Sequence, residues 1–434
     1  MTHRLDVRRG LGLILIMLGL ALPLIYWANQ AAQPAPRSTL VPTEVPATET
    51  ATPIAEHLIP TVAPTTAKTP GLPTGTAKPM VTDTDSSTSR VTKTATRVMV
   101  TIATRAATPS QVATATQTPP APVASALPPV VITGARQRFG IGVSLPAPFI
   151  ARLADLGAGW FLDWNSLASS GRPAGPEYIR MVRVPRGQPR PDLATLADIA
   201  QRSPGSLWLI GNEPDVIWQD NATPEQYVQV YHDVYATLKQ ADPTSRIAIA
   251  GVTQPSPLRL QYLDRILALY WERFGQDMPI DVWNVHNFIL PERRGDWGAE
   301  IPPGLTANSG LIVEIDDHDN LERFKEQIVD FRRWMAERGF RDKELIVSEY
   351  GVLMYEDLGF DYARVRTFML GTFDYFLSAT DGAIGLPSDG NRLVQRWCWY
   401  SLSDGTYPTG NLIDRVTGQL TALGRDFADY IASH

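Results

Sequence analysis

The chain has 434 residues and a formal net charge of -6, from 39 basic and 45 acidic side chains. It lacks the basic excess of most nucleic-acid-binding proteins, and its single cysteine excludes an intramolecular disulfide framework and a zinc site built from thiolates. The 36 prolines are too many to be spread evenly through one globular core, so the composition must change along the chain.

Residues 10–28 form an uncharged, largely apolar segment that follows three arginines within the first nine residues. About 20 apolar residues suffice to cross a hydrocarbon core as a helix, and Tyr26 and Trp27 lie where an interfacial aromatic belt would be. The positive flank predicts a cytoplasmic N-terminus with everything after the segment outside the cell. We therefore expect residues 1–32 to form a basic flank and a retained transmembrane signal-anchor of a single-pass cell-membrane protein. Cleavage of this segment is the alternative, and it would make the protein secreted.

Residues 33–135 differ from the rest of the chain, because no Phe, Tyr or Trp occurs between Trp27 and Phe139. Thr, Pro, Ala, Val and Ser dominate instead. Such a segment cannot bury enough apolar surface to offset its ordering entropy, and its prolines favour extended structure. We predict a disordered Thr/Pro-rich linker that acts as a stalk.

Residues 136–434 are rich in aromatic side chains and contain eight short apolar runs, most of them followed by a helix-like stretch. The runs are Phe139–Leu145, Gly159–Trp164, Tyr178–Val184, Leu207–Gly211, Arg246–Val252, Ile280–His286, Glu344–Ser348 and Arg396–Leu402. Eight strands alternating with helices over about 300 residues predict an α/β fold, a (β/α)8 TIM barrel. An open doubly wound sheet is the alternative, but no G-x-G-x-x-G motif follows the first run.

Two of the expected helices have recognisable ends. Thr223-Pro-Glu-Gln226 is a capping box with proline in the first turn, and it should open a helix that ends before Asp242. A second helix should begin after Asn320, with apolar residues at intervals of three and four, and should end at Gly339.

Two glutamates follow buried runs at the place where a barrel of this type performs chemistry. Glu213 comes two residues after the run Leu207–Gly211, and Glu349 comes directly after the run Glu344–Ser348. The two strands face each other across an eight-stranded barrel, so both side chains can point into one cleft. Two carboxyl groups about 5–5.5 Å apart are the catalytic apparatus of a retaining glycosidase.

The residues around these glutamates resemble the signature of the glycoside hydrolase clan A barrels, namely Asn-Glu-Pro in one strand and Ser-Glu-Tyr-Gly in the other. Gly211-Asn-Glu-Pro-Asp215, Trp283-Asn-Val-His-Asn-Phe288 and Val394-Gln-Arg-Trp-Cys-Trp-Tyr400 are similar to motifs of the glycosyl hydrolase catalytic core family that includes β-1,3-glucanases. The resemblance covers the whole region after the linker, with the motifs in the same order.

The resemblance implies a role for each catalytic residue. Glu213 would be the general acid/base and Glu349 the nucleophile. Asn212 would hydrogen-bond the sugar 2-hydroxyl, a contact that strengthens in the transition state.

The resemblance also implies further substrate-binding residues. His286 would hydrogen-bond near one of the two glutamates, and Trp399 would stack on the sugar, because a flat indole matches the apolar face of a pyranose. Trp397 and Trp399 flank Cys398, and we expect one of these indoles to face the barrel interior. Trp164 and Arg183, at the ends of two earlier strands, could line the cleft.

The sequence therefore predicts a membrane-tethered retaining glycoside hydrolase that cleaves O-glycosidic bonds, expected to be β-linked, in extracellular polysaccharides or oligosaccharides. The reaction needs neither a metal nor another cofactor. Two alternatives remain open. The barrel could bind carbohydrate without cleaving it, or it could be a structural module of the cell surface, in which case the two glutamates should lie well over about 10 Å apart.

Overall fold

The computed structural model describes residues 132, 134–144, 147–167 and 173–434. The expected signal-anchor and nearly all of the expected linker lie outside the described residues and stay predictions. Within the described part of the chain, no helix is both long enough and apolar enough to cross a bilayer.

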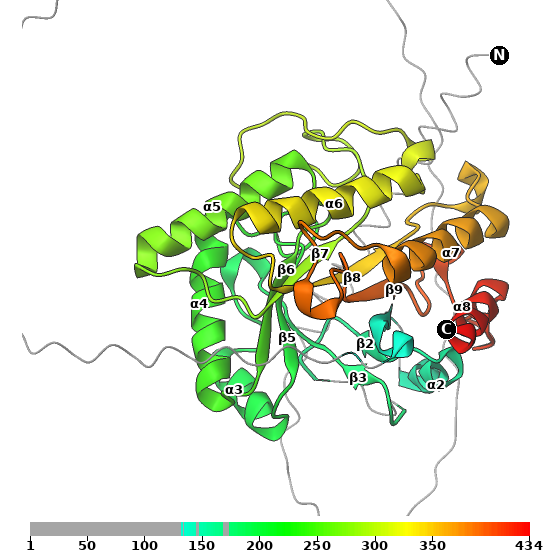
Figure 1. Cartoon of the computed structure of the whole chain (residues 1–434), viewed down its shortest axis with the longest axis horizontal. Coiled ribbons are helices and arrows are strands. Elements are labelled where there is room, and N and C mark those ends of the chain that lie inside the picture. The colour runs from blue at the N-terminus through cyan, green and yellow to red at the C-terminus, as the bar shows by residue number, and fades with distance from the viewer. Residues whose placement is uncertain (1–131, 133, 145–146, 168–172) are drawn as a thin grey trace, which may run out of the picture. The chain divides into compact units, whose positions relative to one another are not determined.

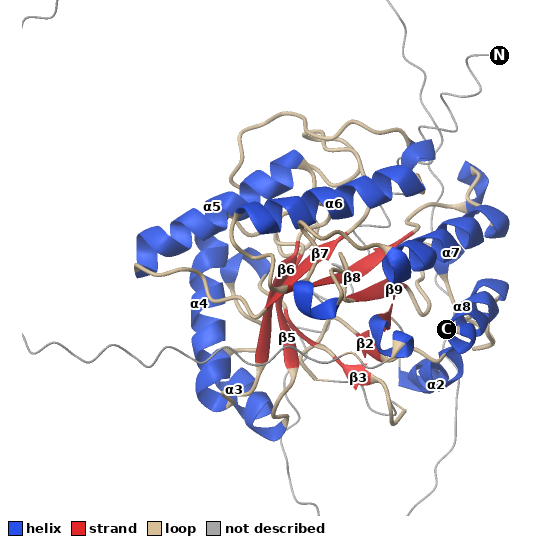
Figure 2. Ribbon diagram, viewed as in Figure 1, coloured by secondary structure: helices blue, strands red, loops and turns tan. Residues whose placement is uncertain are grey.

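The described strands form one parallel sheet at the centre of the domain (Figure 2). They are β1 (Phe139–Gly142), β2 (Trp160–Leu162), β3 (Glu177–Tyr178), β4 (Arg180–Val182), β5 (Leu207–Asn212), β6 (Arg246–Gly251), β7 (Val282–His286), β8 (Glu344–Gly351) and β9 (Arg396–Tyr400). The order across the sheet is β3-β2-β1-β9-β8-β7-β6-β5-β4.

Strands β3 and β4 at the two ends of this order are consecutive parts of one stretch, separated only by Ile179. Its first half pairs with β2, its second half pairs with β5, and the Ile179 N–H donates to the Phe161 carbonyl (2.9 Å). The stretch therefore completes the ring, and the described strands correspond to the eight predicted runs. The predicted parallel barrel is confirmed.

Helices surround the strands (Figure 1). The α-helices of the described residues are α2 (Leu153–Leu156), α3 (Leu193–Arg202), α4 (Pro224–Ala241), α5 (Pro257–Phe274), α6 (Leu321–Glu337), α7 (Tyr362–Ser378) and α8 (Ala422–Ser433). Short 3-10 helices are η1 (Ala135–Arg138), η2 (Ala147–Arg152), η3 (Pro185–Gly187), η4 (Ile315–Asp317), η5 (Glu356–Leu358), η6 (Pro387–Asp389) and η7 (Pro408–Gly410). The alternation departs from expectation at one place, since no helix lies between β2 and β3 among the described residues.

The apolar side chains divide into two clusters because each strand is buried on both faces. A small cluster fills the barrel interior and includes Trp160, Leu209, Ile346 and Cys398. A much larger cluster packs the outer faces of the strands against the helices.

The predicted helix ends are also confirmed. Thr223 and Gln226 form both hydrogen bonds of the capping box at the start of α4, and the Asn320 side chain accepts a hydrogen bond from the Arg323 N–H at the start of α6. The side-chain oxygens satisfy N–H groups that have no partner within the first helical turn.

Candidate active site

Glu213 follows directly after β5, and its backbone occupies the left-handed region with φ of +42°. This backbone conformation costs a non-glycine residue of the order of 1–3 kcal/mol, and it persists only where the surrounding structure holds the residue in place. The Glu213 N–H donates to the Gly251 carbonyl (3.1 Å), and the preceding Asn212 N–H donates to the buried Asp220 carboxylate (2.8 Å). These bonds fix the turn that aims the Glu213 side chain into the barrel mouth.

Glu349 lies within β8, where the pairing with both neighbouring strands is irregular. Val347 and Tyr350 belong to the outer cluster, so strict alternation from Val347 would also direct residue 349 outward. Irregular pairing redirects side chains in this way next to many active sites. As a result Glu349 lines the cleft, and its backbone carbonyl accepts a hydrogen bond from the Asn287 N–H (3.1 Å).

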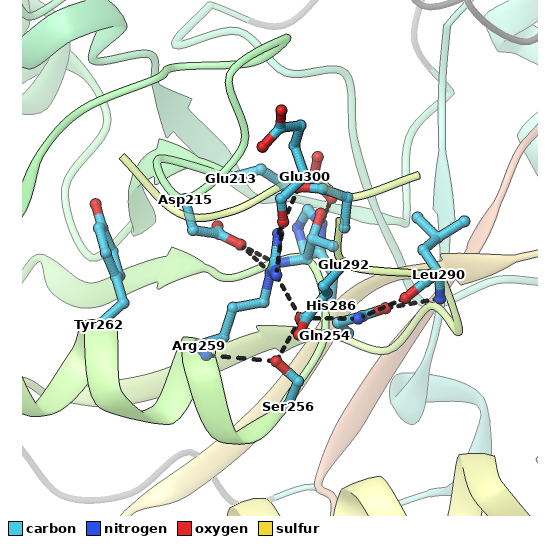
Figure 3. Close-up of polar contacts among 12 residues, drawn as sticks. Glu213, Asp215, Gln254, Ser256, Arg259, Tyr262, His286, Leu290, Glu292 and Glu300 are labelled. Carbon is cyan, nitrogen blue, oxygen red and sulfur yellow. Dashed lines mark hydrogen bonds and ion pairs between the residues drawn. The ribbon is translucent and has the colours of Figure 1, made fainter. Parts of the chain in front are cut away.

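The two glutamates and His286 form one cluster. His286 Nδ1 donates to Glu213 Oε1 at 2.9 Å (Figure 3), and Trp164 Nε1 donates to Glu349 Oε2 at 2.8 Å. One nitrogen or oxygen atom from each of Glu213, His286 and Glu349 lies within 4.8 Å of the other two. The carboxylates are therefore close enough to act on the same bond.

Gly251 at the end of β6 provides the space for the His286 ring. A Cβ atom at this position would lie 2.7 Å from His286 Nε2 and 3.2 Å from Asn284 Nδ2. The imidazole is fully buried, so it has no room to move away without disturbing its bond to Glu213.

An open cleft lies at the cluster. Both glutamates line it together with side chains that are mainly apolar or aromatic. The others are Val216, Trp218, Gln219, Thr253, Phe288, Leu290, Trp297, Gly298, Ala299, Leu353, Met354, Tyr400, Thr406 and Tyr407. All of them follow or end strands β5 to β9, at the carboxyl-terminal edge of the barrel.

The expectation for Trp399 is wrong. Its indole is fully buried in the outer cluster, packs edge-on against Tyr350 and Phe373, and donates from Nε1 to the Gly410 carbonyl (2.8 Å). Residues two apart in a strand share a face, so Trp397 and Trp399 both point to the helices, while Cys398 points inward. Tyr400, on the same side as Cys398, lines the cleft instead.

The structure places Trp164 at the cluster, in edge-on contact with Tyr400 (5.8 Å between ring centroids). Asn212 and Arg183 lie beside the cluster, but neither is among the residues that line the cleft. The Arg183 guanidinium donates to Asp220 (2.7 Å), and the Asn212 side-chain amide donates to Gln219 (3.3 Å). Both side chains thereby brace the turn that carries Glu213.

Thr253 and Tyr400 are cleft residues that the sequence reasoning missed. Thr253 lines the cleft together with Glu213, and the Tyr400 hydroxyl donates to Asp404 (2.9 Å). The sequence held a signal for Thr253, because this residue directly follows the apolar run Arg246–Val252, much as Glu213 follows its own run. For Tyr400 the alternation with Cys398 would have given the correct face.

The pKa of Glu349 is raised to about 7, mainly by burial and also by the nearby Glu213 charge, although His286, Trp164 and Arg183 act to lower it. Burial also acts to raise the pKa of Glu213. The hydrogen bond and charge of His286, with help from Thr253 and Arg259, outweigh it, so this pKa lies below its ordinary value. The pKa of His286 is raised despite burial, because the charges of Glu349 and Glu213 favour the imidazolium. These opposite shifts favour a proton on His286 rather than on Glu213.

The same three side chains could also hold a divalent cation, since each offers one ligand atom. The 2.9 Å separation of His286 Nδ1 and Glu213 Oε1 is a hydrogen-bond length, however, and a nitrogen that donates a proton cannot ligate a metal. The geometry fits a proton-sharing cluster better than a metal site.

Comparison with known proteins gave no matching family model and no matching curated protein. Solved structures do match. One is a GH128 (subgroup II) endo-beta-1,3-glucanase from Sorangium cellulosum, with 16% identity, a TM-score of 0.45, and coverage of 67% of this chain and 97% of that chain. Another is a GH128 (subgroup I) endo-beta-1,3-glucanase from Amycolatopsis mediterranei in complex with laminaritriose, with 18% identity, a TM-score of 0.45, and coverage of 68% and 99%.

A GH128 (subgroup VII) oligosaccharide-binding protein from Cryptococcus neoformans also matches, with 16% identity, a TM-score of 0.46, and coverage of 70% of this chain and 96% of that chain. At this level of similarity the function has to be argued from the site of this chain itself.

We expect Gly251→Ala to push the His286 imidazole away from Glu213 and to lower the pKa of His286, because the hydrogen bond and charge of Glu213 both raise it. Titration of histidine ring signals by NMR, with His286→Asn to assign the signal, measures this shift. An unchanged midpoint for His286 in the Gly251→Ala variant would show that the ring does not depend on this space.

Proposed function

We propose that the protein is a retaining glycoside hydrolase that cleaves β-linked O-glycosidic bonds in a polysaccharide or oligosaccharide. The observation that carries this proposal is the placement of two carboxylates, one buried and one partly buried, within 4.8 Å of each other in a cleft lined by aromatic side chains. Retaining enzymes hold the two groups about 5–5.5 Å apart, whereas inverting enzymes leave room for a water molecule, with about 6.5–9.5 Å. The same separation argues against a purely structural barrel.

The residues of the cluster take the following roles in this proposal. Glu349 attacks the anomeric carbon while Glu213 protonates the departing glycosidic oxygen, which leaves a covalent glycosyl-enzyme. Water then attacks that intermediate, with Glu213 now accepting its proton. The indole N–H of Trp164 binds Glu349 Oε2, which orients the carboxylate and leaves Oε1 to face the sugar.

The resting proton distribution differs from the one that the reaction needs. In the resting form, Glu213 and Glu349 are ionised and His286 is protonated. In the reactive form, Glu213 is protonated, Glu349 is ionised and His286 is neutral. The two forms carry the same number of protons. Transfer of one proton along the 2.9 Å bond from His286 to Glu213 converts the first form into the second. His286 thus stores the proton that Glu213 delivers.

The substrate class rests on the lining of the cleft and on the sequence motifs. Aromatic side chains such as Trp218, Trp297 and Tyr400 suit the apolar faces of pyranose rings. Because the motifs resemble those of a family that includes β-1,3-glucanases, β-1,3-glucan is the first substrate to test. With the predicted signal-anchor, the substrate would lie outside the cell.

A barrel that binds such a glucan without cleaving it is the competing function, and an activity screen on β-1,3-glucan, xylan and mannan separates the two.

The two glutamate roles can be separated by rescue with azide. Glu213→Ala should lower kcat by roughly 10²–10⁴-fold, as expected for loss of a general acid. Azide should then capture the glycosyl-enzyme and give a glycosyl azide of retained configuration. With Glu349→Ala, azide should replace the nucleophile and give the inverted product. NMR of the products from a dinitrophenyl β-glycoside measures both.

The matched control is Glu344→Gln, which removes a buried carboxylate at the opposite end of β8, where Glu344 pairs with Arg246 (2.9 Å). Its kcat should stay near that of the unmodified chain. If Glu213→Ala gave the inverted glycosyl azide and Glu349→Ala the retained one, the roles of the two glutamates would be reversed. Full activity of either alanine variant would refute the mechanism.

The pH profile of kcat/KM provides a separate prediction. Because the nucleophile must be ionised, activity should rise with pH through the Glu349 pKa of about 7. Trp164→Phe removes an N–H donor that lowers this pKa, so the acid limb should move to higher pH. A hydrogen bond to a charged group contributes about 1.5–3 kcal/mol, which corresponds to roughly one to two pH units. An acid limb that stays in place in Trp164→Phe would mean that it does not report Glu349.

A further inference from the structure

We propose that Arg259 is a positioning residue that fixes one wall of the cleft relative to Glu213 and thereby determines how tightly the sugar units along that wall are bound. The inference rests on the proposed function, since it assigns a specificity role within the same cleft. It arises from a buried network of charged side chains behind the wall (Figure 3).

The wall belongs to the long connection between β7 and α6, residues 287–320, part of which forms the yellow-green loop beside α5 and α6 in Figure 1. Trp297, Gly298 and Ala299 from this connection line the cleft. The base of the loop is an antiparallel pairing, in which the Glu292 N–H donates to the Leu311 carbonyl and the Gly310 N–H donates to the Glu292 carbonyl (2.8 Å each). This pairing closes the loop but does not attach Trp297 to the barrel.

The attachment is made by Arg259, a fully buried side chain in the first turn of α5. Its Nε donates to Asp215 Oδ2 (2.6 Å), its Nη1 donates to the Glu292 carboxylate, and its Nη2 donates to the Ala299 carbonyl (2.7 Å). One guanidinium therefore joins three segments: the turn after Glu213, the base of the loop, and the loop residue next to the cleft.

Glu292 strengthens the same attachment. Its carboxylate is fully buried, and it accepts hydrogen bonds from Ser256, from Gln254 (3.0 Å) and from the Leu311 N–H (2.8 Å), besides that of Arg259. A buried carboxylate with this many donors is costly to displace, because any freed charge would remain without water. The loop is thus held in one position.

The chemistry of this junction requires arginine. The three acceptors lie in different directions around the planar guanidinium, which presents fixed donors to each of them. A lysine ammonium keeps the charge, but it is a single point at the end of a flexible chain and cannot reach both Asp215 and the Ala299 carbonyl with the same geometry. Substitution by lysine should therefore release the wall while the buried carboxylates keep a cation.

The effect should fall on substrate binding rather than on the chemical step. The Glu213 carboxylate is oriented by His286, and Glu349 by Trp164, and neither contact involves Arg259. Arg259 otherwise acts on Glu213 through Asp215, two residues along the chain, and through its positive charge, which lysine keeps. Loosening the wall should therefore raise KM more than it lowers kcat.

The test compares Arg259→Lys with Arg332→Lys in the full-length chain. Arg332 is an equally buried guanidinium that donates to the Leu393 and Lys343 carbonyls and to the Gln395 side chain, and none of these residues lines the cleft. Arg259→Lys should raise KM for a β-1,3-gluco-oligosaccharide by at least about tenfold, equivalent to about 1.4 kcal/mol, with kcat within about threefold. Arg332→Lys should leave both constants unchanged even where it lowers Tm.

A second readout does not depend on catalysis. Hydrogen exchange of the backbone amides in residues 291–311 should accelerate in Arg259→Lys and not in Arg332→Lys, because the Ala299 N–H bonds only within the loop, to the Pro291 carbonyl (3.0 Å). If the unmodified chain cleaves no glycan, the proposed function fails. Faster exchange of residues 291–311 in Arg259→Lys would still support the positioning role of Arg259.

Two outcomes would overturn the inference: unchanged exchange in residues 291–311, or a loss of kcat with KM unaltered. If Arg259→Lys does not fold, Glu292→Gln takes its place, since it preserves shape and leaves Arg259 paired with Asp215. It should give the same direction of change in exchange and in KM, and the absence of both would count against the inference.

Discussion

The site depends on one electrostatic constraint, which is that two ionised carboxylates with oxygen atoms within 4.8 Å of each other in a largely buried cleft need a nearby positive charge or a shared proton. His286 relieves the repulsion between the carboxylates, because its ring lies against Glu213 and can carry a proton in place of either glutamate. Much of the nearby structure serves this arrangement. Gly251 leaves space for the imidazole, Asp220 ties down the turn before Glu213, and the irregular pairing of β8 directs Glu349 inward.

The barrel and the centre of the site could be predicted because their signals are local. A fully buried strand produces a continuous apolar run, and a charged residue at the end of such a run is conspicuous whatever the fold around it. Glu213, His286 and Glu349 all follow this pattern, so the sequence placed them at the same edge of the barrel. The capping box of Thr223 and Gln226 is equally local, and it was correct in both of its hydrogen bonds.

The remainder of the site depends on contacts between distant parts of the chain. Nothing near Trp164 in the sequence indicates that its indole N–H reaches Glu349, and nothing around Arg259 indicates that it joins Asp215 to the Ala299 carbonyl. The error at Trp399 has a different cause. Residues two apart in a strand share a face, so Trp397 and Trp399 had to lie on the same side, whereas the expectation placed one of them inward and the family resemblance selected Trp399.

This contrast separates the cleft into two parts that obey different constraints. The floor of the cleft consists of the strand ends that carry Glu213 and Glu349. The barrel fixes the directions of these side chains, so the spacing of the two carboxylates follows from the fold. The wall consists of a loop whose position is set by a buried arginine and two buried carboxylates, Asp215 and Glu292, which the barrel does not require. Because the guanidinium contacts the turn after Glu213 as well as the loop, the wall is located relative to Glu213 rather than to the helices alone. Under the proposed function, substrate preference could therefore change through the loop while the chemistry at the strand ends stays the same.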